Sequence, residues 1–187
     1  MNQLLDERLV EVDRNLEDAL RAGWHDASRI VAELVRGPLS APTTATCPAL
    51  AVRAGSLVVV MTFDGDARGT AALIAPADSA RLLTEQLLTG EGCTDEEILS
   101  YVPAATVEIG NILMNAIVAR VGRERREAYR FDVPVPVRPD ELHRLLAAGP
   151  VPHVVQGAVS FQDRPGRTDA RLEVLVQIDG GNAGIDP

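Results

Sequence analysis

A carboxylate and two carboxamides in this sequence have the spacing of neighbours on one face of a helix. They are Glu108, Asn111 and Asn115, at positions i, i+3 and i+7. A carboxamide can orient a water molecule and a carboxylate can pair with a cation, so the stripe could act by positioning alone. No nucleophile or cluster of metal ligands accompanies it in the sequence. The alternative is a solvated helix face, because polar stripes opposite apolar ones are typical of amphipathic helices.

The element that must hold this stripe is a helical region running from Thr94 to about Val121. Thr94 answered by Glu97 predicts a capping box at its start, and Gly122 predicts its end. Pro103 predicts a break rather than one continuous rod. The face opposite the stripe is expected to be buried through apolar residues at helical spacing: Ile109, Ile112, Leu113, Ala116 and Ile117.

Helices and strands elsewhere in the chain follow from their own periodicities. Further helices are expected over 4–21, Trp24–Val35, Asp78–Leu88 and Asp140–Ala148. Thr43–Thr46 leads into strand-like residues at Ala49–Val52, and strands are expected over Leu57–Phe63, Thr70–Ala75, Phe131–Val137, His153–Gln162 and Arg171–Ile178. In Phe131–Val137 valines alternate with prolines, which is typical of a sheet edge or a bulge.

The order of these elements predicts the fold class and the domain organisation. Helices, three strands, helices and three strands, joined by hairpins, indicate an α+β protein with antiparallel pairing. Each half is a helical segment followed by strands, which suggests an internal duplication. We therefore expect one domain over 1–178, with halves 1–90 and 91–178, and a disordered tail over 179–187.

Composition excludes several classes of protein. The chain has 187 residues, 46% of them hydrophobic, and a net charge of −9, so general nucleic-acid binding is not expected. Apolar runs such as Leu57–Met61 fall far short of the ~20 residues that span a bilayer, and the N-terminus resembles no signal peptide. Two cysteines, Cys47 and Cys93, form neither a disulfide framework nor a zinc site. We expect a cytoplasmic protein without a membrane segment.

The stretch from Val107 to Leu113 resembles the signature of the CheC/CheX/FliY family of chemotaxis phosphatases. The family pattern is serine or aspartate, three residues, glutamate, two residues, asparagine, 22 residues and proline; Glu108, Asn111 and Pro134 match it. The strands around 58–76 and the helix after them also resemble the family. The resemblance implies a pseudo-two-fold fold with a continuous sheet of about six strands and long helices packed on it.

Two positions depart from the family pattern. Ala104 stands in place of the leading serine or aspartate, next to Pro103, which removes a side chain that could cap or position the helix. In the first half, Asp18 and Arg21 stand where a second glutamate and asparagine would be. Since an arginine offers no acceptor to a water molecule, one active centre is expected rather than two.

The resemblance implies dephosphorylation of a CheY-like response regulator. Asn111 would align a water molecule beside the regulator's aspartyl phosphate, Glu108 would pair with a regulator lysine, and Asn115 and Pro134 would support the motif. The protein would need no cofactor of its own, because Mg²⁺ is expected on the regulator. A CheD-like partner and a homodimer are both compatible with the resemblance. Two alternatives stay open: a catalytically silent binding or scaffold module on the same fold, and an accidental match on an unrelated α+β domain.

A local excess of arginine follows the motif helix. Arg123, Arg125 and Arg126, here called the distal arginines, lie within a stretch from Arg120 to Arg130 that carries a net positive charge. We hypothesise that they steer an acidic regulator surface toward the site. The alternative is a solvated helix end whose arginines complement the helix dipole.

Overall fold

The residues that the structure describes form one seven-stranded antiparallel sheet. The computed structural model describes residues 2–35, 40–46, 52–88, 91–147, 149–159 and 170–179; side chains are described from Asn15 onward, except that of Thr46. The strand order is β1-β6-β7-β3-β2-β4, with β5 also paired to β2. The strands are β1 (Thr43–Thr46), β2 (Leu57–Gly65), β3 (Arg68–Ala75), β4 (Tyr129–Phe131), β5 (Val135–Val137), β6 (His153–Val159) and β7 (Ala170–Asp179).

The sheet confirms the predicted class and the two predicted hairpins. β2 pairs with β3 from Leu57↔Ala75 to Phe63↔Gly69, and β6 pairs with β7. β1 occupies Thr43–Thr46, which we expected only to lead into a strand, while 47–51 lie outside the described residues and Val52 is not in a strand. The expected strand end at 160–162 and the tail from 180 onward also lie outside them.

The prediction of one continuous strand over Phe131–Val137 is wrong, but the prediction that this segment lies at a sheet edge is confirmed. It is divided into β4 and β5, which both pair with β2. Phe63 pairs with Phe131 and Val60 with Val135, so three steps along β2 match four steps along the edge. One extra residue is therefore accommodated near Pro134, which is a β-bulge, and such bulges are common beside functional sites.

Four helices accompany the sheet in the described part of the chain: α1 (Asn2–Val35), α2 (Ala77–Leu87), α3 (Asp95–Arg125) and α4 (Pro139–Leu146). The two helices predicted before Val35 are one, so the predicted interruption near Gly23 is wrong. A Cβ at Gly23 would lie 2.5 Å from the Cα of Ile117 in α3. Glycine thus serves the close approach of two helices there and does not end the first one.

The predicted break in α3 at Pro103 is also wrong. The helix runs through Pro103 and past Gly122, and it ends at Arg126 in the left-handed conformation. Proline removes the hydrogen bond to the carbonyl of Leu99, but both residues are exposed, so water can satisfy that carbonyl. The predicted capping box is confirmed: the backbone N–H of Glu97 donates to Thr94 Oγ1 at 3.3 Å, and that of Thr94 donates to the Glu97 carboxylate at 2.8 Å.

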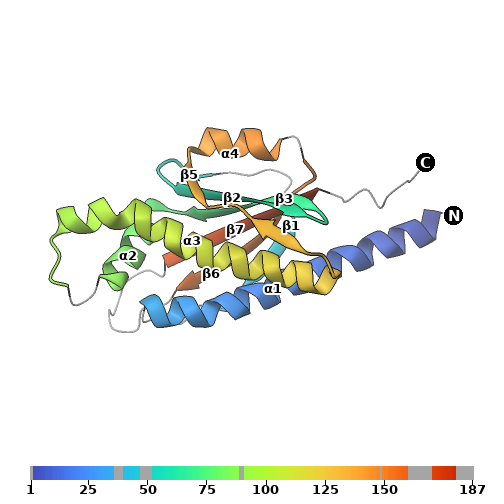
Figure 1. The fold of residues 1–187 in the computed structure, drawn as a ribbon, viewed down its shortest axis with the longest axis horizontal. Coiled ribbons are helices and arrows are strands. Elements are labelled where there is room, and N and C mark those ends of the chain that lie inside the picture. Colours follow the sequence, from blue (N-terminus) through green and yellow to red (C-terminus); the bar gives the residue numbers. More distant parts are fainter. Residues whose placement is uncertain are drawn as a thin grey trace.

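Helices cover both faces of the sheet unequally. α1, α2 and α3 pack on one face, where Figure 1 shows α1 and α3 side by side, and α4 lies on the other. The larger core lies under α1 and α3 and includes Trp24, Leu73, Leu113, Ile117 and Val174, all 0% exposed. A smaller core joins α4 to the second face through Leu142 and Leu146.

The strand order carries the symmetry that the predicted duplication requires. If β1 is exchanged with the β4–β5 edge, β2 with β6 and β3 with β7, the result is the same strand order read from the other edge of the sheet. The same exchange relates α1 to α3, because each precedes its group of strands. At the matching place in the first half, between β1 and β2, the described residues 52–56 contain no helix that corresponds to α4. The residue boundaries of the halves, 1–90 and 91–178, stay a prediction.

Candidate functional site

The predicted stripe lies on the outward face of α3. Glu108 is exposed, and Asn111 and Asn115 are half-buried beside it. Ile109, Leu113 and Ile117 turn toward the core on the opposite side of the helix. Ile112 and Ala116, which we expected to be buried, are only partly so, because at 100° per residue they lie between the two faces.

This outward face differs in charge from an ordinary solvated helix face. Glu108 is the only charged residue from Ile98 to Ala119. Tyr101 and Ala104 are exposed on the same stripe, and Tyr101 keeps 51% of its surface accessible. α1, by contrast, exposes five charged residues after Asn15: Asp18, Arg21, Asp26, Arg29 and Glu33. A charge-poor exposed face is typical of an interaction surface.

The same lack of charge gives α3 the composition of a membrane span. Within the described part of the chain it is the one helix long and apolar enough to cross a bilayer. It packs against α1, α2 and the sheet, as the core helix of a globular domain does. Its apolar character is therefore accounted for by burial on one side and by the charge-poor stripe on the other.

The stripe has one internal hydrogen bond and one carboxylate without a partner among the described residues. The Asn115 side-chain amide donates a hydrogen bond to Asn111 Oδ1 at 2.6 Å. Glu108 makes no hydrogen bond or ion pair with any residue that the structure describes. The carboxylate is thus available to a cation from outside the chain, while one atom of the Asn111 carboxamide is held from within it.

Ala104 stands inside α3 and not at a helix end, so the capping role that we considered for this position is wrong. The N-cap is Thr94, ten residues earlier, and it is fully formed. The placement of Glu108 consequently depends on the packed helix, not on the residue at 104. With alanine at 104, the stripe has no polar side chain one turn before Glu108.

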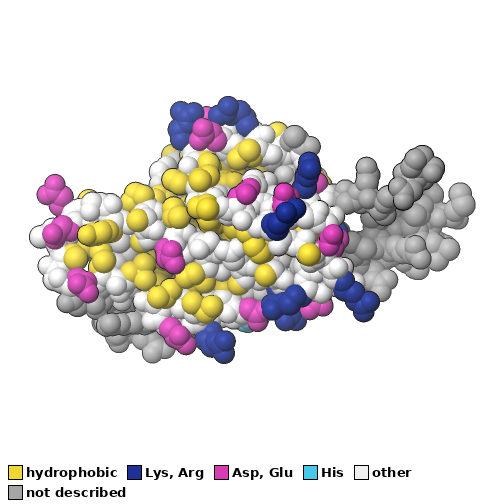
Figure 2. All heavy atoms as spheres, viewed as in Figure 1, with side chains coloured by type: hydrophobic (Ala, Val, Ile, Leu, Met, Phe, Trp, Pro, Cys, Tyr) yellow, Lys and Arg dark blue, Asp and Glu magenta, His cyan; other side chains and the backbone are white. Residues whose placement is uncertain are grey.

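Pro134 is buried at the bulge between β4 and β5, and α3 contacts both strands. The neighbouring valines on this edge are unusually accessible: Val133 is 81% exposed and Val135 is 50% exposed. Figure 2 shows hydrophobic side chains gathered over the middle of this face, around β5 and α3, with charged side chains mainly toward its margins. Sequence reasoning missed these valines as surface residues, although their alternation with prolines is a signal of an exposed edge.

The first-half counterpart of the stripe is occupied by its own ion pairs. Arg21 contacts Asp18 at 3.2 Å and Glu17 at 3.1 Å, and it donates to Thr44 Oγ1 at 2.7 Å. These contacts connect α1 to β1. They favour a structural role for Arg21 and agree with the expectation of one centre only.

The arginines after the stripe are largely paired within the protein. Arg123 lies 3.0 Å from Asp26 of α1, and Arg125 lies 3.0 Å from Glu127. Arg126 has no ion-pair partner among the described residues. Arg123 follows Asn111 by twelve residues, so the two residues lie ~18 Å apart along the helix axis. This distance exceeds the Debye length of ~8 Å at physiological salt, so the charge of Arg123 is largely screened at Asn111 under those conditions.

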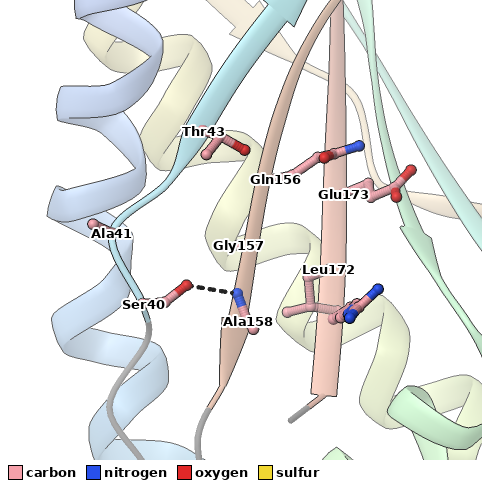
Figure 3. A pocket seen from close by; sticks show the side chains of 9 residues that line it. Ser40, Ala41, Thr43, Gln156, Gly157, Ala158, Leu172 and Glu173 are labelled. Carbon is pink, nitrogen blue, oxygen red and sulfur yellow. Dashed lines mark hydrogen bonds between the residues drawn. The ribbon is translucent and has the colours of Figure 1, made fainter.

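A groove lies on the face of the sheet opposite to α3. This groove of about 270 Å³ is lined by residues of β6, β7 and the segment leading into β1, and Figure 3 shows it with α3 behind the strands. Gln156 and Glu173 face it, and the Ala158 N–H donates to Ser40 Oγ at 2.9 Å. The described residues contain no group of three metal-ligating side chains there or elsewhere.

Comparison with solved structures identifies the fold. The sequence matches no protein-family model and no curated protein. A putative chemotaxis protein from Desulfovibrio vulgaris has a TM-score of 0.62 at 12% identity, covering 88% of this chain and 96% of its own. CheX from Desulfovibrio desulfuricans has a TM-score of 0.61 at 11% identity, covering 88% and 99%. CheX in a complex with CheY, BeF3 and Mg²⁺, from Borrelia burgdorferi, has a TM-score of 0.55 at 16% identity, covering 84% and 96%. The chain therefore has the fold of CheX and CheC-like proteins.

Proposed function

We propose that this protein is a CheC-like phosphatase that docks a phosphorylated CheY-type response regulator on the outward stripe of α3. The observation that carries the proposal is that Glu108 and Asn111 lie one turn apart on an exposed helix face that is otherwise uncharged. Residues at i and i+3 on a helix have Cβ atoms ~5–6 Å apart, so the two groups can act on one bound partner. The fold shared with CheX supports the assignment, and one CheX neighbour forms a complex with CheY.

In this proposal the chain accelerates hydrolysis by positioning. Asn111 holds a water molecule in line with the phosphorus of the aspartyl phosphate, and Glu108 pairs with a lysine of the regulator. The water oxygen bonds to phosphorus, the bond to the aspartyl oxygen breaks, and the proton of the water leaves with the phosphate product. The regulator's own Mg²⁺ neutralises the charge that develops. No covalent intermediate on this chain is needed.

A rigid helix suits this kind of chemistry. Effective molarities from fixed orientation reach 10⁵ M and more, provided that the reacting groups are held closely. Ile109 and Leu113 anchor α3 in the core directly behind the stripe. The side chains of Glu108 and Asn111 therefore approach a partner from a backbone that does not need to be ordered on binding.

A second function rests on the same surface. A catalytically silent binding or scaffold module would keep the charge-poor stripe and lack the reaction, and Ala104 in place of the family serine or aspartate is the feature that favours it. The fold does not distinguish the two functions, because a chain of a FliG–FliM complex from H. pylori has a TM-score of 0.54 at 12% identity, close to the 0.55 of CheX from Borrelia burgdorferi, and covers 89% of this chain and 93% of its own. In either case we place the protein in the cytoplasm, where a CheD-like partner or a second copy could also bind.

The deciding experiment follows the decay of a phosphorylated CheY-type regulator from the same organism. We expect wild-type protein to accelerate decay and Asn111→Ala to lose about 100-fold of that acceleration, while affinity for the BeF3-treated regulator is retained. Asn15→Ala is the matched control, since Asn15 is an exposed asparagine on α1. Binding without acceleration by the wild type would establish the silent module. Neither binding nor acceleration with any regulator tested would refute both functions.

A further inference from the structure

We infer that Asn115 is the positioning residue that fixes the orientation of the Asn111 carboxamide. The inference rests on the proposed function for its consequence, but the contact itself is independent of it. Asn115 Nδ2 donates to Asn111 Oδ1 at 2.6 Å across one turn of α3. Both side chains are half-buried, so water competes less for this bond than it would on an open surface.

The bond assigns a role to each atom of Asn111. A carboxamide has an acceptor oxygen and a donor nitrogen on opposite sides of the same carbon. Because Oδ1 is held by Asn115, Nδ2 is turned away from Asn115 and keeps both N–H donors for a ligand. The group presented to a partner is thus a donor, which can hold the oxygen of a water molecule while a lone pair remains for phosphorus.

Without Asn115 the carboxamide of Asn111 could rotate by half a turn and present its oxygen. Such a rotation exchanges a donor for an acceptor at the same point in space, so a water molecule held there would turn its hydrogens toward Asn111. Asn115 therefore selects one of two orientations of nearly equal shape. This selection concerns hydrogen-bond polarity, so isosteric variants can test it without changing the packing of α3.

Four isosteric variants separate the polarity of the contact from its shape, and one of them, Asn111→Leu, removes the acceptor and with it the bond. Asn115→Asp can only accept, so it should bind Asn111 Nδ2 and invert the carboxamide. Asn115→Leu makes no bond and leaves both orientations accessible. Asn111→Asp keeps an acceptor opposite Asn115 and should strengthen the bond through its charge.

The first readout is NMR of the side-chain amides in ¹⁵N-labelled protein, which does not depend on phosphatase activity. One Asn115 amide proton should exchange slowly and shift downfield in the wild type. It should move further downfield in Asn111→Asp and upfield in Asn111→Leu. An Asn115 amide that exchanges freely in the wild type, or that is unaffected by Asn111→Leu, would overturn the inference.

The second readout is turnover of the phosphorylated regulator. We expect kcat to fall about tenfold in Asn115→Leu and about 100-fold in Asn115→Asp, with KM changed by no more than about twofold. A purely structural role would affect the two variants alike and would alter KM or stability first. Wild-type kcat in Asn115→Asp would overturn the positioning role. A wild type that does not accelerate decay refutes the proposed function, and the NMR result still decides whether Asn115 orients Asn111.

Discussion

The contact between Gly23 and Ile117 makes the spacing of α1 and α3 testable by one methyl group. In Gly23→Ala the new Cβ would lie 2.5 Å from the Ile117 Cα, 3.1 Å from the Ile117 carbonyl oxygen and 3.2 Å from that of Ala116. All three atoms belong to the backbone of α3. No rotamer change can relieve the overlap, so one helix must move away from the other.

The expected destabilisation follows from two opposing effects. Replacing glycine by alanine inside a helix stabilises it by about 1 kcal/mol in the absence of new contacts. Overpacking a core costs about 1–3 kcal/mol, and contact with backbone places Gly23→Ala at the upper end of that range. We therefore expect a net loss of about 2 kcal/mol in the free energy of unfolding. For a chain of 187 residues this corresponds to a Tm lowered by about 4–8 °C.

The assay is urea unfolding followed by circular dichroism, with Gly110→Ala as the matched control. Gly110 is also a buried helical glycine, but the nearest atom to its new Cβ is a Leu73 methyl carbon at 3.2 Å, which can move. We expect Gly110→Ala to stay within about 1 kcal/mol of the wild type. A Gly23→Ala protein as stable as the control would show that α1 and α3 are not in contact at Gly23, and this account of the continuous first helix would fail.

Three further outcomes are expected. Tyr101 lies on the stripe and is 51% exposed, so Tyr101→Ala should weaken regulator binding about tenfold, as measured by calorimetry. Leu99 is 55% exposed but lies on the opposite side of α3, so Leu99→Ala should leave binding unchanged. Equal effects of the two variants would show that the stripe is not the docking surface. Thr94→Ala should lower the Tm by about 2–4 °C at neutral pH through loss of the N-cap. Hydrogen bonds from Thr94, the backbone one first, lower the pKa of Glu97, and Thr94→Ala removes only the side-chain one. The part of the difference that this side-chain bond contributes should be present above the ordinary carboxylate range and shrink as the pH falls through the lowered value; a fully pH-independent difference would contradict this. At about 0.01 M salt, where the Debye length of ~30 Å exceeds the distance from Arg123 to the stripe, alanine at all three distal arginines should reduce the association rate and flatten its salt dependence; an unchanged salt dependence would exclude steering.

Local signals in the sequence predicted the elements whose causes are local. The Thr94–Glu97 capping box and the hairpin from Leu57 to Ala75 were found because each depends on neighbouring residues. The two errors in the helices have long-range causes. Gly23 indicates a helix break only if Ile117, 94 residues later, is unknown, and Pro103 indicates a break only if its turn is assumed to be buried.

The sequence predicted that the candidate residues share one face of a helix, but it did not predict their surroundings. The spacing of Glu108 and Asn111 is a property of one helix, so the sequence was sufficient. The exposure of Val133 depends on a bulge in the pairing with β2, and the pairing of Arg123 with Asp26 depends on the packing of α1 against α3. Neither of these can be obtained from the periodicity of a single segment. The hydrogen bond between Asn115 and Asn111 was within reach, because a spacing of four residues on a helix predicts contact.

The two halves of the sheet are related by symmetry, but the two long helices have opposite surface chemistry, and this difference argues for one docking face. After Asn15, α1 exposes five charged residues, and one of them, Arg21, contacts Asp18, Glu17 and Thr44. Between Ile98 and Ala119, α3 carries a single carboxylate, that of Glu108, and it has no partner among the described residues. The charge-poor stripe on α3, where Glu108 and Asn111 lie, therefore supports the proposed docking of a partner on this helix.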